Sequence, residues 1–328
     1  MIASAESFLA QARAGDKRSI ARLLTIVEND EPGSADILRS LYPETGRARI
    51  VGVTGPPGGG KSTLVSRLAA FYGKTYDRIA IVAVDPSSPF TGGAILGDRI
   101  RMRDRFLDEG VFIRSMASRG HAGGLSRATM RVVNVLDALG TGLVIVETVG
   151  VGQEEVDVVR VADTVCLVTV PGLGDDIQAI KAGILEIADV LVVNKADKPG
   201  ADQTARDLAQ MLSLGPPVRR GQASPAPGEP HSYGWKPPIV RTSAQDNTGI
   251  DALAKAIDAH VEWSIASGDR DTRRAGAARQ EVEALLREAL VKRLEDRIGH
   301  QRVTDAVARV AKRELDPYRA VDELLGTQ

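Results

Sequence analysis

A glycine-rich segment that follows an apolar run carries the first sign of chemistry. Residues 55–62 read Gly-Pro-Pro-Gly-Gly-Gly-Lys-Ser, which fits the pattern G-x-x-x-x-G-K-[ST] of phosphate-binding loops. In such loops, backbone N–H groups and the N-terminus of the following helix surround phosphate oxygens. We expect Lys61 to contact the β- and γ-phosphates and Ser62 to offer its hydroxyl to Mg²⁺. An incidental glycine-rich turn is the alternative, and the apolar and helix-like flanks argue against it.

Three carboxylates near the ends of predicted strands could complete a magnesium site. Asp85 follows residues 81–84, Asp98 lies in the loop after it, and Glu147 follows residues 144–146. Hard Mg²⁺ prefers oxygen ligands. Each carboxylate taken alone could instead cap a helix or a turn. The predicted metal site is Ser62, Asp85, Asp98 and Glu147.

A second polar motif, Asn194-Lys195-Ala196-Asp197, follows an apolar run and matches the N-K-x-D pattern of guanine-binding proteins. Asp197 can accept hydrogen bonds from N1–H and the exocyclic amine of guanine, whereas adenine offers no matching donors. Asn194 should brace the loop, and the Lys195 stem should lie against the base. These features predict GTP and GDP as ligands.

Two further segments complete the predicted nucleotide site. Residues 147–150, Glu-Thr-Val-Gly, stand where many P-loop GTPases carry Asp-x-x-Gly, which makes the Gly150 N–H available to sense the γ-phosphate. Residues 242–244, Thr-Ser-Ala, should direct a backbone N–H at the guanine carbonyl. The predicted nucleotide-binding residues are Gly55, Pro57, Gly58, Gly59, Gly60, Lys61, Ser62, Thr63, Gly150, Asn194, Lys195, Asp197, Ser243 and Ala244.

Six apolar, β-branched runs alternate with helix-like segments and must position these motifs. Most runs are continuous, as expected for parallel strands that helices cover on both faces. The pattern predicts an α/β fold with a doubly wound, mostly parallel sheet, in which ligands bind at the carboxyl edge. The expected strands are residues 49–53, 79–84, 143–147, 164–170, 190–193 and 239–242.

Helical extensions are predicted on either side of this P-loop domain. Asp16 is a plausible N-cap for a helix with Ile20, Leu23, Leu24 and Val27 on one face, and residues 37–41 suggest another helix. Near the C-terminus the apolar residues are spaced as in amphipathic helices, and they could either pack on the domain or form a dimer arm. Those residues are Val282, Leu285, Leu286, Ala289, Leu290, Val303, Val307, Val310 and Ala311. The predicted divisions are 1–46, 47–265 and 266–328, with a Pro/Gly/Ser-rich surface loop over 215–238.

Bulk composition limits the classes of partner. The 328 residues carry a formal charge of −1, so we expect neither nucleic acid nor a membrane as a partner. The single cysteine, Cys166, lies in an apolar run and suits a small buried side chain in a cytoplasmic protein. The four scattered histidines do not form a zinc-like set.

Several longer stretches resemble one family, the MeaB/ArgK-type P-loop GTPases, which is also the methylmalonic aciduria type A protein family. They are residues 84–88, 91–99, 118–125, 146–153 and 171–181. The resemblance implies a GTPase chaperone, usually homodimeric through C-terminal helices. Such a chaperone gates adenosylcobalamin loading into a cobalamin-dependent acyl-CoA mutase, methylmalonyl-CoA mutase or a relative, and protects or reactivates it.

The resemblance also implies roles for individual residues. The implied catalytic residues are Lys61, Asp98 and Glu147, of which the two carboxylates manage Mg²⁺ and the attacking water. Residues 175–181 would be a further switch loop. Gln153 lies three residues beyond Gly150, so it is not assigned the task of positioning water. The segment 56–59 and the insertion over 215–235 depart from the commoner family pattern.

Two other functions stay open from the sequence. A P-loop kinase that phosphorylates a small molecule or a transport component would need a substrate pocket with a positioned base, and no separate candidate for one stands out. A nucleotide-dependent interaction module, in which turnover is incidental, is the other alternative.

Overall fold

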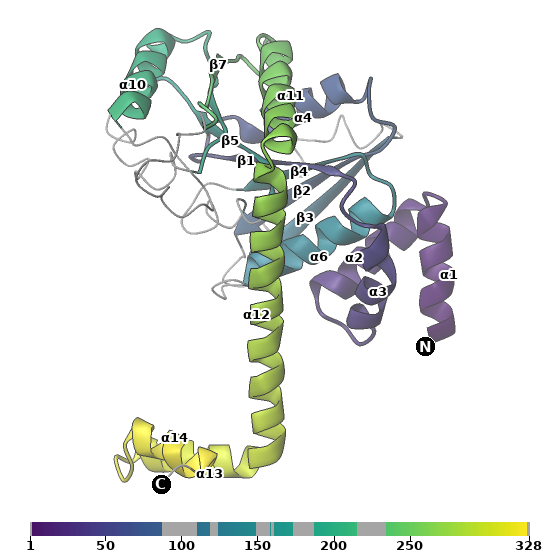
Figure 1. Ribbon diagram of the computed structural model, residues 1–328, viewed down its shortest axis with the longest axis vertical. Coiled ribbons are helices and arrows are strands. Elements are labelled where there is room, and N and C mark those ends of the chain that lie inside the picture. Colours follow the sequence, from purple (N-terminus) through teal and green to yellow (C-terminus); the bar gives the residue numbers. More distant parts are fainter. Residues whose placement is uncertain are drawn as a thin grey trace. The chain divides into compact units, whose positions relative to one another are not determined.

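The computed structural model describes residues 2–86, 110–118, 124–148, 158, 161–172, 187–214 and 234–326 (Figure 1). The chain divides into two compact units, Met1–Arg274 and Ala275–Gln328. The first unit holds the sheet and every described residue of the predicted nucleotide site.

A seven-stranded sheet forms the centre of the first unit, with the strand order β3-β2-β4-β1-β5-β6-β7. Every pairing between these strands is parallel, so the predicted doubly wound α/β fold is confirmed. The chain moves to one side of β1 for β2 to β4 and to the other side for β5 to β7, which places the topological switch point at β1. The strands are β1 (Arg49–Thr54), β2 (Ile79–Pro86), β3 (Val111–Ser118), β4 (Leu143–Thr148), β5 (Thr164–Thr169), β6 (Val190–Val193) and β7 (Ile239–Arg241).

Helices cover both faces of the sheet, which explains why the strands read as continuous apolar runs. Along β2, Ile79 and Ile81 pack with α4 (Lys61–Tyr72) and α11 (Ile250–Ala266), whereas Ala80 and Val82 pack with α6 (Gly124–Ala138). Helix α10 (Ala201–Leu214) packs against β6 and β7. Because neighbouring residues of a strand face opposite sides, both layers are needed to bury a run such as β2.

The one described strand absent from the sequence expectation is β3. Among the described strands, it lies at an edge of the sheet and pairs only with β2. Its side chains are only half-buried from Phe112 to Ser115, and Arg114 donates to the Glu28 carboxylate at 3.0 Å. A polar, half-buried edge strand lacks the continuous apolar run that identifies the central strands.

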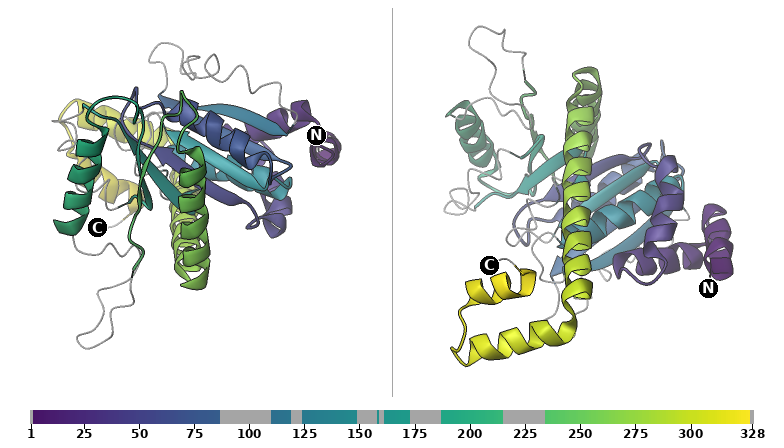
Figure 2. Two further views of the ribbon diagram at one scale, coloured as in Figure 1. Left: turned by 90° about the horizontal axis from the view of Figure 1, so that it is seen from above. Right: turned by 60° about the horizontal axis from the view of Figure 1, so that its bottom comes forward.

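The N-terminal helices are α1 (Ile2–Arg13), α2 (Lys17–Glu28) and α3 (Ser34–Leu41). The expected cap is confirmed, because Asp16 accepts a hydrogen bond from the Ser19 N–H at 2.8 Å. Leu23, Leu24 and Val27 are fully buried on one face of α2, which packs on α6. Figure 2 shows α1 beside α2.

Cys166 lies in β5 and is fully buried, as expected for a small core side chain. Burial raises the pKa of its thiol well above the ordinary value. Because the thiolate is the reactive form, this cysteine is chemically inert in the folded protein.

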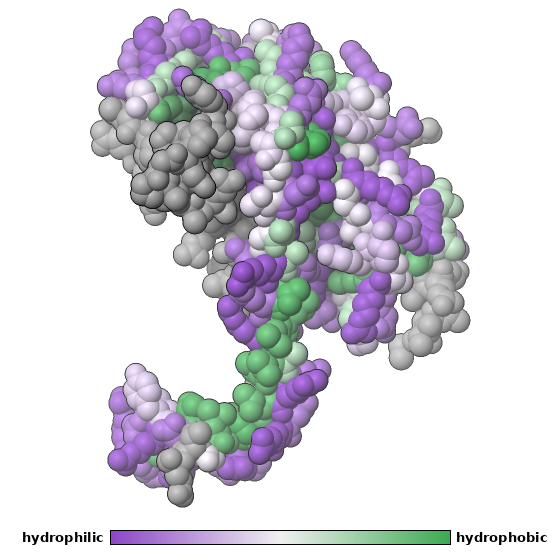
Figure 3. Space-filling model, viewed as in Figure 1, coloured by the Kyte–Doolittle hydropathy of each residue, from purple (hydrophilic) through white to green (hydrophobic). Residues whose placement is uncertain are grey.

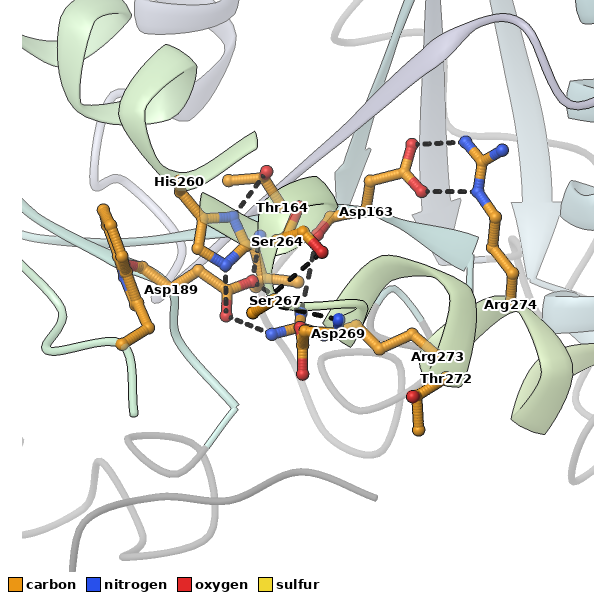
Figure 4. Close-up of polar contacts among 12 residues, drawn as sticks. Asp163, Thr164, Asp189, His260, Ser264, Ser267, Asp269, Thr272, Arg273 and Arg274 are labelled. Atoms are coloured by element: carbon orange, nitrogen blue, oxygen red, sulfur yellow. Dashed lines mark hydrogen bonds and ion pairs between the residues drawn. The ribbon is translucent and has the colours of Figure 1, made fainter. Parts of the chain in front are cut away.

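Two arginines attach the start of α12 (Asp269–Ile298) to the amino ends of the strands (Figure 4). Arg274 donates two hydrogen bonds of 2.9 Å to Asp163, and Arg273 donates two of 2.9 Å to Asp189. The hydrogen bonds that Arg274 donates to the Asp163 carboxylate raise the pKa of this arginine. Removing one partner of a buried pair costs about 3–5 kcal/mol because the other charge stays buried.

Each of these carboxylates also ties two strands together. Asp163 accepts from the Ile50 N–H at 3.2 Å, and Asp189 accepts from the Val165 N–H at 2.8 Å. Buried His260 adds a contact, since its Nδ1 lies 2.8 Å from the Thr164 hydroxyl. The start of α12 is therefore fixed at the sheet edge opposite the predicted nucleotide site.

The second unit contains the rest of α12, α13 (His300–Ala311) and α14 (Pro317–Leu325). Ala306 of α13 packs with Leu315 and Ala320 in a small core. Among the described residues, no helix is both long and apolar enough to cross a membrane.

Candidate nucleotide site

The predicted site residues gather at the carboxyl edge of the sheet. The loop from Gly55 to Gly60 joins β1 to α4, Glu147 lies near the end of β4, and the other two motifs follow β6 and β7. Asp85 lies near the end of β2 beside β4, but its side chain is outside the described set. Asp98, Gly150 and residues 175–181 lie outside the described residues.

Two glycines of the phosphate loop occupy positions that only glycine fits. Gly55 has φ +137°, and a Cβ there would lie 2.0 Å from the Val168 carbonyl oxygen. Gly60 has φ +81°, and its Cβ would lie 2.5 Å from the Asn194 side-chain nitrogen. The loop thus packs directly on β5 and on the loop after β6, which fixes its path.

Lys61 begins α4 and points its ammonium group back at the loop. It is 6% exposed, and its Nζ donates to the carbonyl oxygens of Gly55 at 2.7 Å and Pro56 at 2.9 Å. A buried ammonium at the start of a helix adds a full positive charge to the helix N-terminus. This combination suits an anion with several oxygens.

Ser62 and Glu147 meet at the same edge. The Ser62 hydroxyl donates to the Glu147 carboxylate at 2.6 Å, although 85 positions separate the two residues. Glu147 is 4% exposed, and the neighbouring Thr148 hydroxyl donates to the Thr54 hydroxyl at 2.9 Å. A hydroxyl and a buried carboxylate beside a phosphate loop are hard oxygen donors that fit Mg²⁺.

Asn194 joins the phosphate loop to the segment after β7. Its side-chain N–H₂ donates to the Gly59 carbonyl oxygen at 2.8 Å. Its Oδ1 accepts from the Thr242 hydroxyl and from the Ala244 N–H, each at 3.1 Å. Asn194 therefore makes one hydrogen bond to the phosphate loop and two to the segment after β7, as a residue that braces the loop should.

Lys195 and Asp197 stand on the outer side of Asn194. Lys195 adopts φ +56°, and its ammonium donates to the Gly58 carbonyl oxygen at 2.8 Å, so its stem spans the space between the two loops. Asp197 is exposed, and its Oδ1 accepts from the Ser243 hydroxyl at 2.9 Å. Ser243 also lies 2.6 Å from an oxygen of Asp246.

Two contacts in the site were not predicted from the sequence motifs. The Ala244 N–H, one of the backbone donors in the segment expected to face a guanine carbonyl, donates to Asn194 in this structure. Arg67, which no motif marked, donates from Nε to the Ala244 carbonyl oxygen at 3.0 Å. Nothing in the spacing of α4 points to this contact, since 177 positions separate the two residues.

The arrangement can hold a nucleotide along one edge of the sheet. Phosphate groups would meet the amides of the loop and the Lys61 ammonium, and the base would meet the carboxylate of Asp197. Because Asn194 and Lys195 both bond to the phosphate loop, this loop and the loop after β6 are held at a fixed spacing.

The sequence matches known proteins along most of its length. A family model described as methylmalonyl Co-A mutase-associated GTPase MeaB matches residues 20–298. A putative GTPase of Pyrococcus abyssi is 47% identical over 320 residues, which cover 98% of this chain and 95% of the relative. GTPase ArgK of Escherichia coli is 38% identical over 249 residues, covering 75% of this chain and 72% of the relative.

A mammalian relative and a solved structure extend the likeness. The mitochondrial methylmalonic aciduria type A homolog of Mus musculus is 31% identical over 279 residues, covering 84% of this chain and 64% of the relative. A crystal structure of a LAO/AO transport system kinase superposes with a TM-score of 0.69 at 25% identity. That alignment covers 99% of this chain and 97% of the other.

Proposed function

The chain belongs to the MeaB family of methylmalonyl-CoA mutase-associated GTPases, and on that premise we propose that it is a chaperone of a cobalamin-dependent acyl-CoA mutase. It gates adenosylcobalamin loading and protects or reactivates the mutase. The observation that carries the nucleotide part is the bridge through Asn194, which joins the phosphate loop to the base loop. The mutase part rests on the family description and on the methylmalonic aciduria type A relative.

The proposed chemistry assigns each described side chain a task. Lys61 neutralises charge on the β- and γ-phosphates, and the amides of residues 58–63 bind their oxygens. Mg²⁺, which Ser62 and Glu147 would hold together with the predicted ligands Asp85 and Asp98, would supply further positive charge. Glu147 orients the Ser62 hydroxyl through their 2.6 Å hydrogen bond. Asp197 selects guanine.

Capture of a mutase by the immobilised full-length chain tests the chaperone proposal. We expect a purified adenosylcobalamin-dependent acyl-CoA mutase from the source organism to bind, with an affinity that differs about tenfold between GDP and a non-hydrolysable GTP analogue. Nucleotide can shift partner affinity only through such a difference between two states. Binding is measured by surface plasmon resonance in each nucleotide.

The control is the Lys61→Ala variant, which should bind the mutase without responding to nucleotide. If no mutase from the source organism binds in any nucleotide state, the chaperone role is wrong. Transfer of labelled phosphate from GTP to a small molecule instead of to water would favour the kinase alternative.

A homodimer joined through α12 is part of the same proposal. Within the second unit, α12 carries exposed apolar side chains, with Val282 at 64%, Leu286 at 57% and Leu290 at 50% exposure. Figure 3 shows hydrophobic residues following one another along this helix. A continuous apolar stripe of this kind favours association with a second copy, because helices with a two-turn apolar repeat pair along it.

Leu286→Lys should therefore shift the protein from dimer to monomer, with the dissociation constant raised about 100-fold or more, since an unpaired charge is costly in an apolar seam. Sedimentation equilibrium measures the change. Glu288→Lys is the matched control, because it introduces the same side chain ~200° around the helix and should leave the dimer intact. Dimerisation of Leu286→Lys with unchanged affinity would exclude this seam.

A further inference from the structure

Arg67 connects the helix that follows the phosphate loop to the loop that follows β7. It lies on α4, which begins at Lys61. Its Nε donates to the Ala244 carbonyl oxygen at 3.0 Å, and its Nη2 donates to the Gln245 carbonyl oxygen at 3.2 Å. The planar guanidinium offers these donors in a fixed geometry, so one side chain fixes two successive peptide groups.

The segment that Arg67 holds is a closed turn. The backbone groups of Ser243 and Thr248 exchange two hydrogen bonds of 3.0 Å. Gly249, with φ +74°, lies so close to Arg241 that a Cβ would approach its carbonyl oxygen to 2.2 Å. Because its two ends are bonded to each other, a contact at Ala244 and Gln245 constrains the position of the whole turn.

The same turn contacts Asp197, which is proposed to read the base, and Asn194, which braces the loop that carries Asp197. The Thr242 hydroxyl and the Ala244 N–H donate to Oδ1 of Asn194. The Ser243 hydroxyl donates to Oδ1 of Asp197 at 2.9 Å. Asp197 is exposed, so its orientation depends on such neighbours more than a buried side chain would.

We propose that Arg67 is a positioning residue for guanine specificity, which acts on Asp197 and Asn194 through the turn from Thr242 to Thr248. This inference rests on the proposed nucleotide site and adds a residue that no motif contains. The helix that presents Lys61 and Ser62 to the phosphates therefore also sets the orientation of the carboxylate that selects the base. Phosphate binding and base selection share one rigid element.

The test compares two nucleotides that differ in only one of the two donors that Asp197 would recognise, the exocyclic amine. Inosine diphosphate lacks the exocyclic amine of guanosine diphosphate, so the ratio of their affinities measures the contact to that amine. In the wild-type protein we expect a ratio of about 10 to 100, the range for a hydrogen bond to a charged group. In Arg67→Ala the ratio should fall about tenfold, because the Asp197 carboxylate is no longer held in the orientation that accepts from the exocyclic amine. Isothermal titration calorimetry on the full-length protein gives both affinities.

Two variants separate positioning from general destabilisation. Arg78→Ala removes a comparable arginine-to-carbonyl hydrogen bond, 2.9 Å to Leu139, at the opposite edge of the sheet and should leave the ratio unchanged. Arg67→Lys keeps a positively charged donor but has one nitrogen, so it cannot hold both carbonyl oxygens as the guanidinium does. Its affinity ratio should lie between those of wild type and Arg67→Ala.

Equal losses of affinity for both nucleotides in Arg67→Ala, with the ratio unchanged, would overturn the positioning role and leave the nucleotide site standing. A wild-type protein that binds neither nucleotide, or binds both equally, would instead overturn the proposed site together with this inference.

Discussion

Replacement of Lys61 by alanine will lower the rate of GTP hydrolysis by about 10²- to 10³-fold, the usual cost of removing one preorganised group that stabilises transition-state charge. The ammonium lies at the start of α4, is almost fully buried, and is 2.7 Å from the Gly55 carbonyl oxygen. In the proposed nucleotide complex it would lie where charge builds up on the transferring phosphoryl group. Phosphate release under single-turnover conditions, with Mg²⁺ and saturating protein, measures the chemical step directly.

Lys74→Ala is the matched control for this experiment. Lys74 follows the other end of α4 and is exposed, so the same substitution there should leave hydrolysis unchanged. Thermal unfolding of both variants shows whether the fold is retained. A folded Lys61→Ala variant that hydrolyses GTP at the wild-type rate would remove this lysine from the mechanism.

The central strands were predictable because strands that are buried on both faces appear in the sequence as continuous apolar runs. Residues such as Ile79 to Val84 form an uninterrupted apolar run, and the structure buries all of them. β3 was not predictable in the same way, because its half-buried side chains include Arg114, whose partner Glu28 lies in the N-terminal extension. The polarity of an edge strand depends on what the rest of the fold places beside it.

The residues of the candidate site likewise divide into those that the sequence predicts and those that it does not. The phosphate loop and the segment from Asn194 to Asp197 have fixed residue spacings because a single stretch of backbone must surround one chemical group. Contacts between distant segments leave no such spacing. Arg67 and Ala244 are 177 positions apart, and Arg274 and Asp163 are 111 positions apart. These pairs emerge only once the strands are ordered in the sheet.

The two ends of the parallel strands carry different kinds of polar residues. At the carboxyl edge, Asp197 is an exposed side chain that accepts from the buried Ser243 hydroxyl of another loop. At the amino edge, Asp163 and Asp189 are buried and bound to arginines of α12. Buried, fully paired carboxylates stabilise a fixed arrangement, whereas partly exposed ones can exchange a partner for a ligand. This contrast favours the carboxyl edge as the functional one, in agreement with the position of the switch point at β1.

Asp197→Asn should lower the affinity for GTP by about 100-fold or more and make xanthosine triphosphate the better ligand. The carboxylate would accept from two donors of guanine, whereas an asparagine amide offers one acceptor and one donor, the pattern that matches xanthine. The Ser243 hydroxyl donates to Oδ1 of Asp197. In the variant, the same donor favours the rotamer that places the amide oxygen beside Ser243, which leaves the N–H₂ group to face the base. Competition of both triphosphates against a fluorescent guanosine nucleotide measures the change.

Asp246→Asn makes the same chemical change at the other carboxylate that contacts Ser243, 2.6 Å from its hydroxyl. It should retain the preference for GTP, because Asp246 stands outside the N-K-x-D motif. Wild-type GTP affinity in Asp197→Asn would mean that guanine is not read by this carboxylate. A joint switch to xanthine in both variants would mean instead that Ser243, the neighbour they share, is the group that reads the base.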